Sequence, residues 1–209
     1  MHVIAVAQLD RLIRKLDKLD SEEVTQVLLR QVHLLKQCHG VREWLFMAEP
    51  ESISRLSAEF HTQVPGRLIG TLRGDPLDEF YRATSNHGAD YVADAGRPMV
   101  LRIVPGLQDP NPTTVDAIIT NHIQNGYDYS RTDQVDDGIA PYIEVMSFAV
   151  LDEAWREALL PDDREQISPY IYRQNRRLSL GTFNPSTLGN NTMPVPPYNT
   201  ASSPGISVQ

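Results

Sequence analysis

The first stretch that could carry chemistry is a strand-like run followed by a loop, RIVPGLQDP at positions 102–110. In an α/β sheet, ligands bind at the carboxyl ends of strands, so acidic side chains that act on a ligand are expected where a strand meets its loop. Here the first acidic residue after the apolar run is Asp109, late in the loop. The stretch therefore has the form of an active-site edge without its expected acidic residue.

The other metal-binding and nucleophilic residue types show no pattern typical of a site. Five histidines have neither metal-ligand spacing nor a nucleophile partner: His33, His39, His61, His87 and His122. Cys38 is the single cysteine, which excludes an internal disulfide and a cysteine-rich zinc site and fits a reducing compartment. We interpret the histidines as exposed or core residues and the cysteine as a small apolar filler.

Composition limits the classes of partner. The chain has 209 residues, 41% of them hydrophobic, and a formal net charge of −8. A negative overall field repels phosphate backbones and anionic lipids, and the basic pairs are isolated, so we expect no nucleic-acid partner and no membrane partner. The apolar start of the chain is short and lacks a basic region, and no window approaches the roughly 18 apolar residues of a membrane span. We expect a soluble, unexported protein.

Strand-like and helix-like segments alternate along residues 1–180. The predicted strands are 2–7, 43–48, 66–72, 99–104 and 142–148, and the predicted helices are 9–19, 20–40, 50–60, 75–84, 111–126 and 149–160. Strands separated by helices imply crossover connections, hence a three-layer α/β sandwich with a mainly parallel sheet. The predicted sheet core is Val3, Ile4, Val6, Trp44, Leu45, Phe46, Val100, Leu101, Ile103, Ile143, Val145 and Phe148.

The composition changes after residue 177. From Leu178 to the end there is no charged residue, and Pro, Gly, Ser, Asn and Thr are frequent. We therefore divide the chain into an α/β domain, 1–180, and an extended arm, 181–209, that cannot form a core of its own. The arm's apolar residues are predicted to anchor it on another copy or on a neighbouring protein: Phe183, Leu188, Met193, Val195, Tyr198 and Ile206.

Several segments together resemble a known family, the cytidylyltransferases of the spore-coat polysaccharide type. The most specific is YIEVMSFAVLDEAWREALLPDDREQISPYIYRQNRRLSL, and the looser ones are HVIAVAQ, LRGDPLDEFYRAT and LRIVPGLQDPNPTTVDAIITNHIQNGYDY. The resemblance implies a nucleotide-diphospho-sugar transferase-like fold over about residues 1–180. It also implies an enzyme that joins CTP to a sugar with Mg²⁺, using a glycine-rich phosphate loop and metal-binding carboxylates.

This sequence departs from the family pattern at each of those parts. After the first strand it lacks the Gly-Ser turn, although Arg11 and Lys15 match the cationic positions of the phosphate loop. The loop after residue 104 is two residues shorter, and Asp109 matches only the end of the metal motif. Tyr142 stands where the second metal ligand is expected, and only Asp136 and Asp137 lie near enough in sequence to substitute for it.

Losing a metal ligand usually costs orders of magnitude in rate, and this chain lacks several parts at once. We therefore predict a catalytically inactive nucleotidyltransferase-like domain, without a cofactor. It would serve as a structural or assembly subunit, in the cytoplasm or in a virion or other large complex. One alternative is a divergent cytidylyltransferase with Mg²⁺ held by Asp109, Asp136 or Asp137 and CTP held by Arg11 and Lys15. Another is a regulatory pseudoenzyme that still binds a nucleotide or a sugar.

Overall fold

The computed structural model describes residues 3–71, 74–88, 98–133 and 139–189. The strands are β1 (Val3–Gln8), β2 (Glu43–Ala48), β3 (Arg67–Gly70), β4 (Met99–Val104), β5 (Tyr129–Thr132), β6 (Tyr142–Ser147) and β7 (Leu180–Phe183). The helices are α1 (Asp10–Lys15), α2 (Ser21–Leu35), α3 (Pro50–Ser54), α4 (Ala58–Gln63), α5 (Pro76–Gly88), α6 (Pro112–Asn125), α7 (Phe148–Glu157), α8 (Pro161–Arg164) and α9 (Pro169–Arg173), followed by a 3₁₀ turn, η2 (Pro185–Gly189).

The described strands form one mixed sheet in the order β3-β2-β1-β4-β6-β5-β7. The pairs β1–β2, β2–β3, β1–β4 and β5–β7 are parallel, whereas β6 runs antiparallel to both of its neighbours. Parallel neighbours require crossover connections, and helices supply them. The expected α/β sandwich with a mainly parallel sheet is confirmed.

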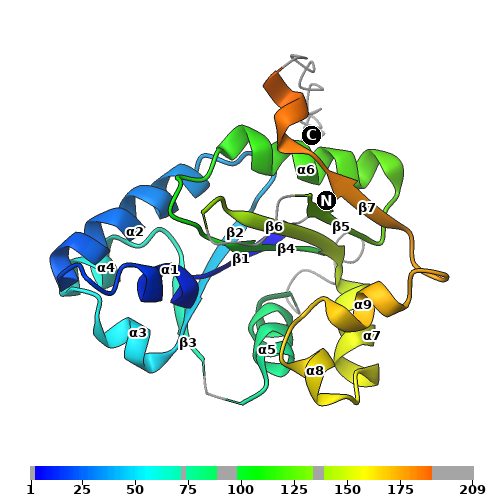
Figure 1. Cartoon of the computed structure of the whole chain (residues 1–209), viewed down its shortest axis with the longest axis horizontal. Helices are drawn as coiled ribbons and strands as arrows, with labels where there is room; N and C mark the ends of the chain where they lie inside the picture. Colours follow the sequence, from blue (N-terminus) through cyan, green and yellow to red (C-terminus); the bar gives the residue numbers. More distant parts are fainter. Residues whose placement is uncertain (1–2, 72–73, 89–97, 134–138, 190–209) are drawn as a thin grey trace, which may run out of the picture.

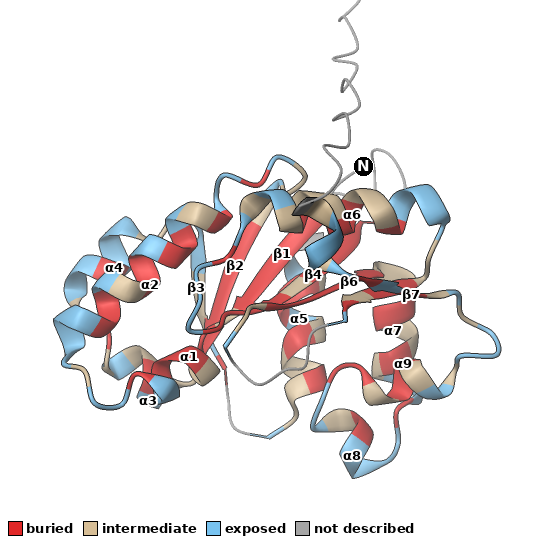
Figure 2. Ribbon diagram, turned by 45° about the horizontal axis from the view of Figure 1, so that its top comes forward, coloured by how far each residue is buried: buried red, intermediate tan, exposed pale blue. Residues whose placement is uncertain are grey.

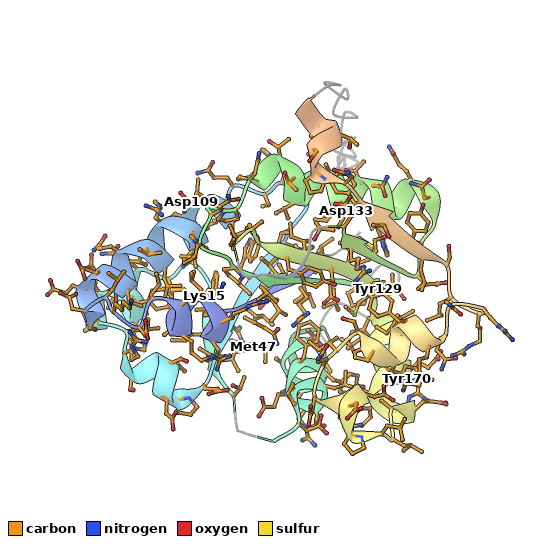
Figure 3. The ribbon with its side chains drawn as sticks, viewed as in Figure 1. Lys15, Met47, Asp109, Tyr129, Asp133 and Tyr170 are labelled. Atoms are coloured by element: carbon orange, nitrogen blue, oxygen red, sulfur yellow. The ribbon has the colours of Figure 1, made fainter. Side chains whose placement is uncertain are left out.

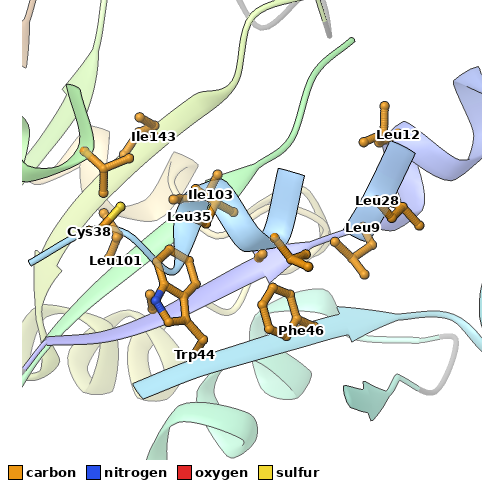
Figure 4. Packing of buried hydrophobic residues seen from close by; sticks show 14 of the residues in the cluster. Leu9, Leu12, Leu28, Leu35, Cys38, Trp44, Phe46, Leu101, Ile103 and Ile143 are labelled. Carbon is orange, nitrogen blue, oxygen red and sulfur yellow. The ribbon is translucent and has the colours of Figure 1, made fainter. Parts of the chain in front are cut away.

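Helices cover both faces of the sheet (Figures 1 and 2), and a hydrophobic cluster lies on each face. Alternate side chains of β1 point to opposite faces: Val3 and Ala5 pack with α1, α2, α4 and α6, whereas Ile4 and Val6 pack with α5, α7 and α9. Figure 4 shows the first cluster, in which Trp44 and Phe46 lie beneath the leucines of α1 and α2. Every predicted core residue is buried except Phe148, which is half-buried at the start of α7.

The first predicted helix is shorter than the leucine spacing suggested. Instead of residues 9–19, α1 spans only Asp10–Lys15. The Arg55 guanidinium donates hydrogen bonds to the carbonyls of Ile13 (2.9 Å) and Leu16 (3.0 Å), so the carbonyls at the end of α1 are satisfied without another helical turn. The buried leucine face of this segment is nonetheless present, with Leu16 at its edge.

The predicted helix over residues 50–60 is two short helices, α3 and α4. The side chain of Thr25 accepts a hydrogen bond from the Ser57 backbone at 3.0 Å, and Ser57 then precedes α4 in an extended conformation. The second helix therefore begins anew and buries Phe60. Strands β5 and β7, and helices α8 and α9, were not predicted from the sequence.

Within the described ranges, none of the helices combines the length and the apolar character needed to cross a bilayer.

Candidate functional site

A cleft of about 350 Å³ lies at the carboxyl ends of three adjacent parallel strands, β2, β1 and β4. Gln8 and Val104, the last residues of β1 and β4, lie in its wall. The remaining lining residues come mainly from α1, the loop after β2 and the start of α5: Asp10, Arg11, Arg14, Met47, Glu49, Thr71, Pro76, Glu79 and Arg102. This is the edge at which an α/β sheet binds ligands, so the cleft is the candidate site.

The connection from β1 to α1 is a single residue, Leu9. Its backbone N–H donates to the Met47 carbonyl at 2.9 Å, and the Asp10 carboxylate accepts from the Glu49 N–H at 2.7 Å. The side chains of Leu9 and Leu12 are fully buried against α2 and β2 (Figure 4). The backbone here is therefore part of the core and does not form a loop that wraps around an anion.

Charges of both signs line the cleft in equal number. Arg11, Arg14 and Arg102 face Asp10, Glu49 and Glu79. The Arg14 guanidinium lies 3.6 Å from the Glu49 carboxylate, so part of this charge is paired within the wall. A polyphosphate needs a clear excess of positive charge, and the cleft does not offer one.

The inner wall of the cleft is joined to a buried polar network. Arg102 on β4 donates from Nε to Gln8 Oε1 at 2.7 Å and from Nη1 to Glu144 Oε2 at 2.5 Å. The other oxygen of Glu144, Oε1, accepts from the hydroxyls of Tyr129, Ser168 and Tyr142, the last at 3.2 Å. Glu144 is fully buried, and both of its carboxylate oxygens accept hydrogen bonds from protein donors.

The network continues to the outer strands through aromatic residues. The Tyr172 hydroxyl lies 2.8 Å from the Tyr129 hydroxyl, and the Arg131 guanidinium lies over the Tyr172 ring at 4.8 Å. Arg131 and Arg102 are the two cross-strand partners of Glu144, on β5 and β4. One buried carboxylate is therefore flanked by a cation in each neighbouring strand.

The charged state of this network follows from these contacts. Burial alone would raise the pKa of Glu144, but the Arg102 charge and the donated hydrogen bonds hold the pKa below its usual range. Burial alone would lower the pKa of Arg102, but the Glu144 charge outweighs it and the pKa is raised. Burial raises the pKa of Tyr142, and Glu144 raises it further, so this phenol stays neutral.

The structure separates the predicted ligand-binding residues. Arg11 lines the cleft, whereas Lys15 lies at the end of α1 and is not among the lining residues (Figure 3). Asp109 is drawn to α2, where the Arg30 guanidinium contacts its carboxylate at 3.0 Å. Asp136 and Asp137 lie outside the described residues.

The loop after β4 is held in place by hydrogen bonds to α2 and to the segment before β6. The Gln108 N–H donates to the Ile139 carbonyl at 2.8 Å, and the Gln31 amide donates to the Gly106 carbonyl at 2.9 Å. A Cβ at Gly106 would lie only 2.3 Å from the Ile139 carbonyl oxygen. The loop after β4 thus packs closely against the segment before β6.

The predicted arm is partly built into the domain. Phe183 ends β7, which pairs with β5 and crosses the proposed boundary at 180/181, and its side chain is 8% exposed in the first core cluster. Leu188 packs against the same cluster. These two residues therefore contact their own chain, contrary to our expectation that they anchor a partner. Met193, Val195, Tyr198 and Ile206 lie outside the described residues.

Neither Arg102 nor the role of Glu144 was predicted from the sequence. Each is a lone charged residue inside an otherwise apolar strand segment, MVLRIV and YIEVMSF. Two such residues of opposite sign in predicted central strands are a signal for a buried pair, because an unpaired buried charge is very costly.

Among the residues that the structure describes, there is no cluster of three or more His, Cys, Asp or Glu side chains that could hold a metal ion.

Several solved structures share this fold, cytidylyltransferases among them. A cytidylyltransferase from Leptospira borgpetersenii superposes with a TM-score of 0.65 and 16% identity, over 88% of this chain and 75% of that one. A CMP-2-keto-3-deoxy-manno-octonic acid synthetase in complex with CTP gives 0.55 and 11%, over 88% and 90%. Rv0371c from Mycobacterium tuberculosis in complex with manganese gives 0.51 and 11%, over 88% of both chains. The chain thus has a nucleotidyltransferase-like α/β fold.

One curated protein shares recognisable sequence with this chain. It is the uncharacterized protein MJ1063 of Methanocaldococcus jannaschii, 30% identical over 111 residues. The match covers 50% of this chain and 40% of that protein, so the chain spans well under two thirds of its relative. No protein-family model matches the sequence.

Proposed function

We propose that this protein is a nucleotidyltransferase-fold subunit that does not transfer nucleotides and has a structural or assembly role in a larger complex such as a virion. The observation that carries the proposal is the direct connection from β1 to α1 through the buried Leu9. A nucleotidyltransferase needs a run of converging backbone amides after this strand to hold a triphosphate. In this chain the same backbone is committed to the core.

A divalent metal, such as the manganese in the complex of one structural neighbour, does not fit the described residues at this edge either. By resemblance to the family, the cation would lie between the end of β4 and the start of β6. Val104 and Tyr142 are paired there, and they offer an alkyl group and a neutral phenol. Magnesium and manganese prefer carboxylate and carbonyl oxygens, so this pair is a poor site for them.

A divergent cytidylyltransferase, of the spore-coat type or another, is the second candidate. Arg11 favours it, since a cation of the expected phosphate loop does line the cleft. The position of Asp109 beside α2 speaks against it, because that carboxylate is paired with Arg30 outside the cleft lining. The equal numbers of cationic and acidic residues in the lining also favour the first proposal.

Calorimetry with CTP and Mg²⁺, together with an assay for pyrophosphate release in the presence of sugar acids, separates the candidates. We expect no heat of CTP binding at millimolar concentrations and no pyrophosphate. CTP binding that Arg11→Ala weakens, while the surface variant Arg30→Ala leaves it intact, would revive a nucleotide site. Pyrophosphate release would overturn the proposal, and binding without release would indicate a regulatory domain.

The assembly role is supported by the composition of the C-terminal segment, which is uncharged from Leu178 onward. It is also supported by exposed apolar side chains on the domain, notably Leu159 and Leu160, which are 84% and 57% exposed. Light scattering of the full chain and of a chain ending at residue 189 tests the role. We expect the full chain to associate and the shortened one to be monomeric. If both chains have the same oligomeric state, the arm has no part in assembly.

A further inference from the structure

By resemblance to the family, a divalent cation would lie between the end of β4 and the start of β6, two residues along each strand from the Arg102–Glu144 ion pair. On β4 and β6 the pairs Val104–Tyr142 and Arg102–Glu144 are separated by one intervening pair, Ile103–Ile143, so their side chains point to the same face of the sheet. Arg102 also lines the cleft, with its side chain 17% exposed. A permanent positive charge is thus present at the inner end of the candidate site.

The Arg102 guanidinium is held from two sides. Gln8 on β1 accepts from Nε, and Glu144 on β6 accepts from Nη1. These acceptors belong to the two strands that flank β4 in the sheet. The side chain therefore joins three strands at the edge of the cleft, much as a metal ion joins ligands from separate elements.

Both oxygens of Glu144 are already engaged by protein donors. Its four hydrogen-bond donors are the side chains of Arg102, Tyr129, Tyr142 and Ser168, which together occupy its two oxygens. Oε1 accepts from three hydroxyls, and Oε2 is held by the positively charged guanidinium, which disfavours a second cation beside it. Removing the arginine would leave a buried carboxylate without its main counter-charge.

We propose that Arg102 is a built-in replacement for the divalent cation of the nucleotidyltransferase fold, a fixed cation that joins β1, β4 and β6 and makes this edge of the sheet independent of metal ions. The proposal rests on the proposed function, because an active metal-dependent enzyme would need the exchangeable ion. It differs from that proposal in its readout, which is stability and metal binding instead of turnover.

Chemical rescue of the full chain tests this role. Thermal unfolding of the unaltered protein should be the same in EDTA, Mg²⁺ and Mn²⁺. Arg102→Ala should lower the Tm by roughly 10 °C, since it leaves a buried charge unpaired. Guanidinium or Mn²⁺ at millimolar concentrations should restore at least half of that loss, whereas NaCl of the same ionic strength should not.

Arg30→Ala is the matched control, because Arg30 pairs with Asp109 at the surface and should show neither the large loss nor the rescue. If Arg102→Ala does not fold, the single variant Arg102→Met is compared with the double variant Arg102→Met/Glu144→Gln. The double variant should be the more stable of the two, because it no longer contains the unpaired buried charge. A Tm of the unaltered protein that rises with Mn²⁺ would overturn the proposal. So would a folded Arg102→Ala that no small cation rescues, or a double variant no more stable than Arg102→Met.

Pyrophosphate release from CTP would contradict the proposed function without touching these stability readouts, so the two failures are distinguishable.

Discussion

At the scale of single residues, buried titratable groups set the response of the protein to pH. His122 on α6 is 3% exposed, and its Nδ1 lies 2.8 Å from the Ser130 hydroxyl on β5. Burial lowers the pKa of His122 to about 4, against a smaller opposing effect of the Asp128 charge. The imidazole is therefore neutral in the folded protein at neutral pH and takes up a proton more readily when the chain unfolds.

This difference predicts a loss of stability on acidification. The contribution of neutral His122 is fully present above pH 6.5 and is lost as the pH falls toward about 4, because only the unfolded chain is protonated in that window. The shift corresponds to roughly 3 kcal/mol at its lower end. Urea unfolding between pH 7 and pH 4.5 should show a steep decline in the free energy of unfolding.

His122→Asn should flatten that decline, whereas His39→Gln, which alters an exposed histidine beside Asp116, should leave it unchanged. An equal slope in the unaltered protein and in His122→Asn would show that the histidine is not the source.

The buried Glu144 adds a further loss of stability at lower pH. Because its pKa is depressed, its contribution is present above pH 4.5 and is lost as the pH falls below that value.

At the scale of elements, the end of α6 depends on one left-handed residue. Gly126 has φ 63° and ψ 34°, and the chain turns there from α6 toward β5. A side chain in this conformation is strained even though open space surrounds the glycine. Gly126→Ala should lower the free energy of unfolding by about 1 kcal/mol, and Gly126→Asn by less.

Gly74→Ala is the control for that substitution. Gly74 also has open space around it but does not have a positive φ, so an added methyl group should be neutral or slightly stabilising. Equal effects of alanine at the two positions, measured by denaturant unfolding, would contradict the assignment of strain to Gly126.

At the scale of the whole molecule, the start of the C-terminal segment belongs to the α/β domain. The backbone of Phe183 accepts a hydrogen bond from the Asp133 N–H at 2.9 Å, and a Cβ at Gly181 would lie 2.4 Å from the Tyr127 ring. β7 is therefore closely fitted to the edge of the sheet. A boundary at residue 180 would cut the chain inside this strand.

Two shortened chains test that boundary. A chain that ends at residue 189 keeps β7 and η2, and its Tm should lie within a degree or two of the full chain. A chain that ends at residue 180 loses the buried Phe183, for which truncation typically costs about 3–5 kcal/mol, and should unfold many degrees lower. Similar melting temperatures for the two chains, measured by circular dichroism, would restore the boundary at 180.

The sequence by itself determined the elements whose hydrophobic pattern is regular. β1, β2, β4 and β6 are apolar runs covered on both faces, and α2 has a capping box at Asp20 and Glu23 that marks its start. Local patterning fixes such elements because burial follows the period of the backbone. The leucine spacing after β1 also predicted the helix that the structure has there, although over a longer stretch.

The tertiary structure alone decided the rest. β5 and β7 are four-residue strands with mixed polarity, and their pairing with each other joins segments as distant as Tyr129 and Leu180. The pairing of Arg102 with Glu144 depends on register between β4 and β6, as does the meeting of Val104 with Tyr142. Such contacts arise between segments roughly 40 residues apart, and no local period of one segment reports which residue of the other will face it.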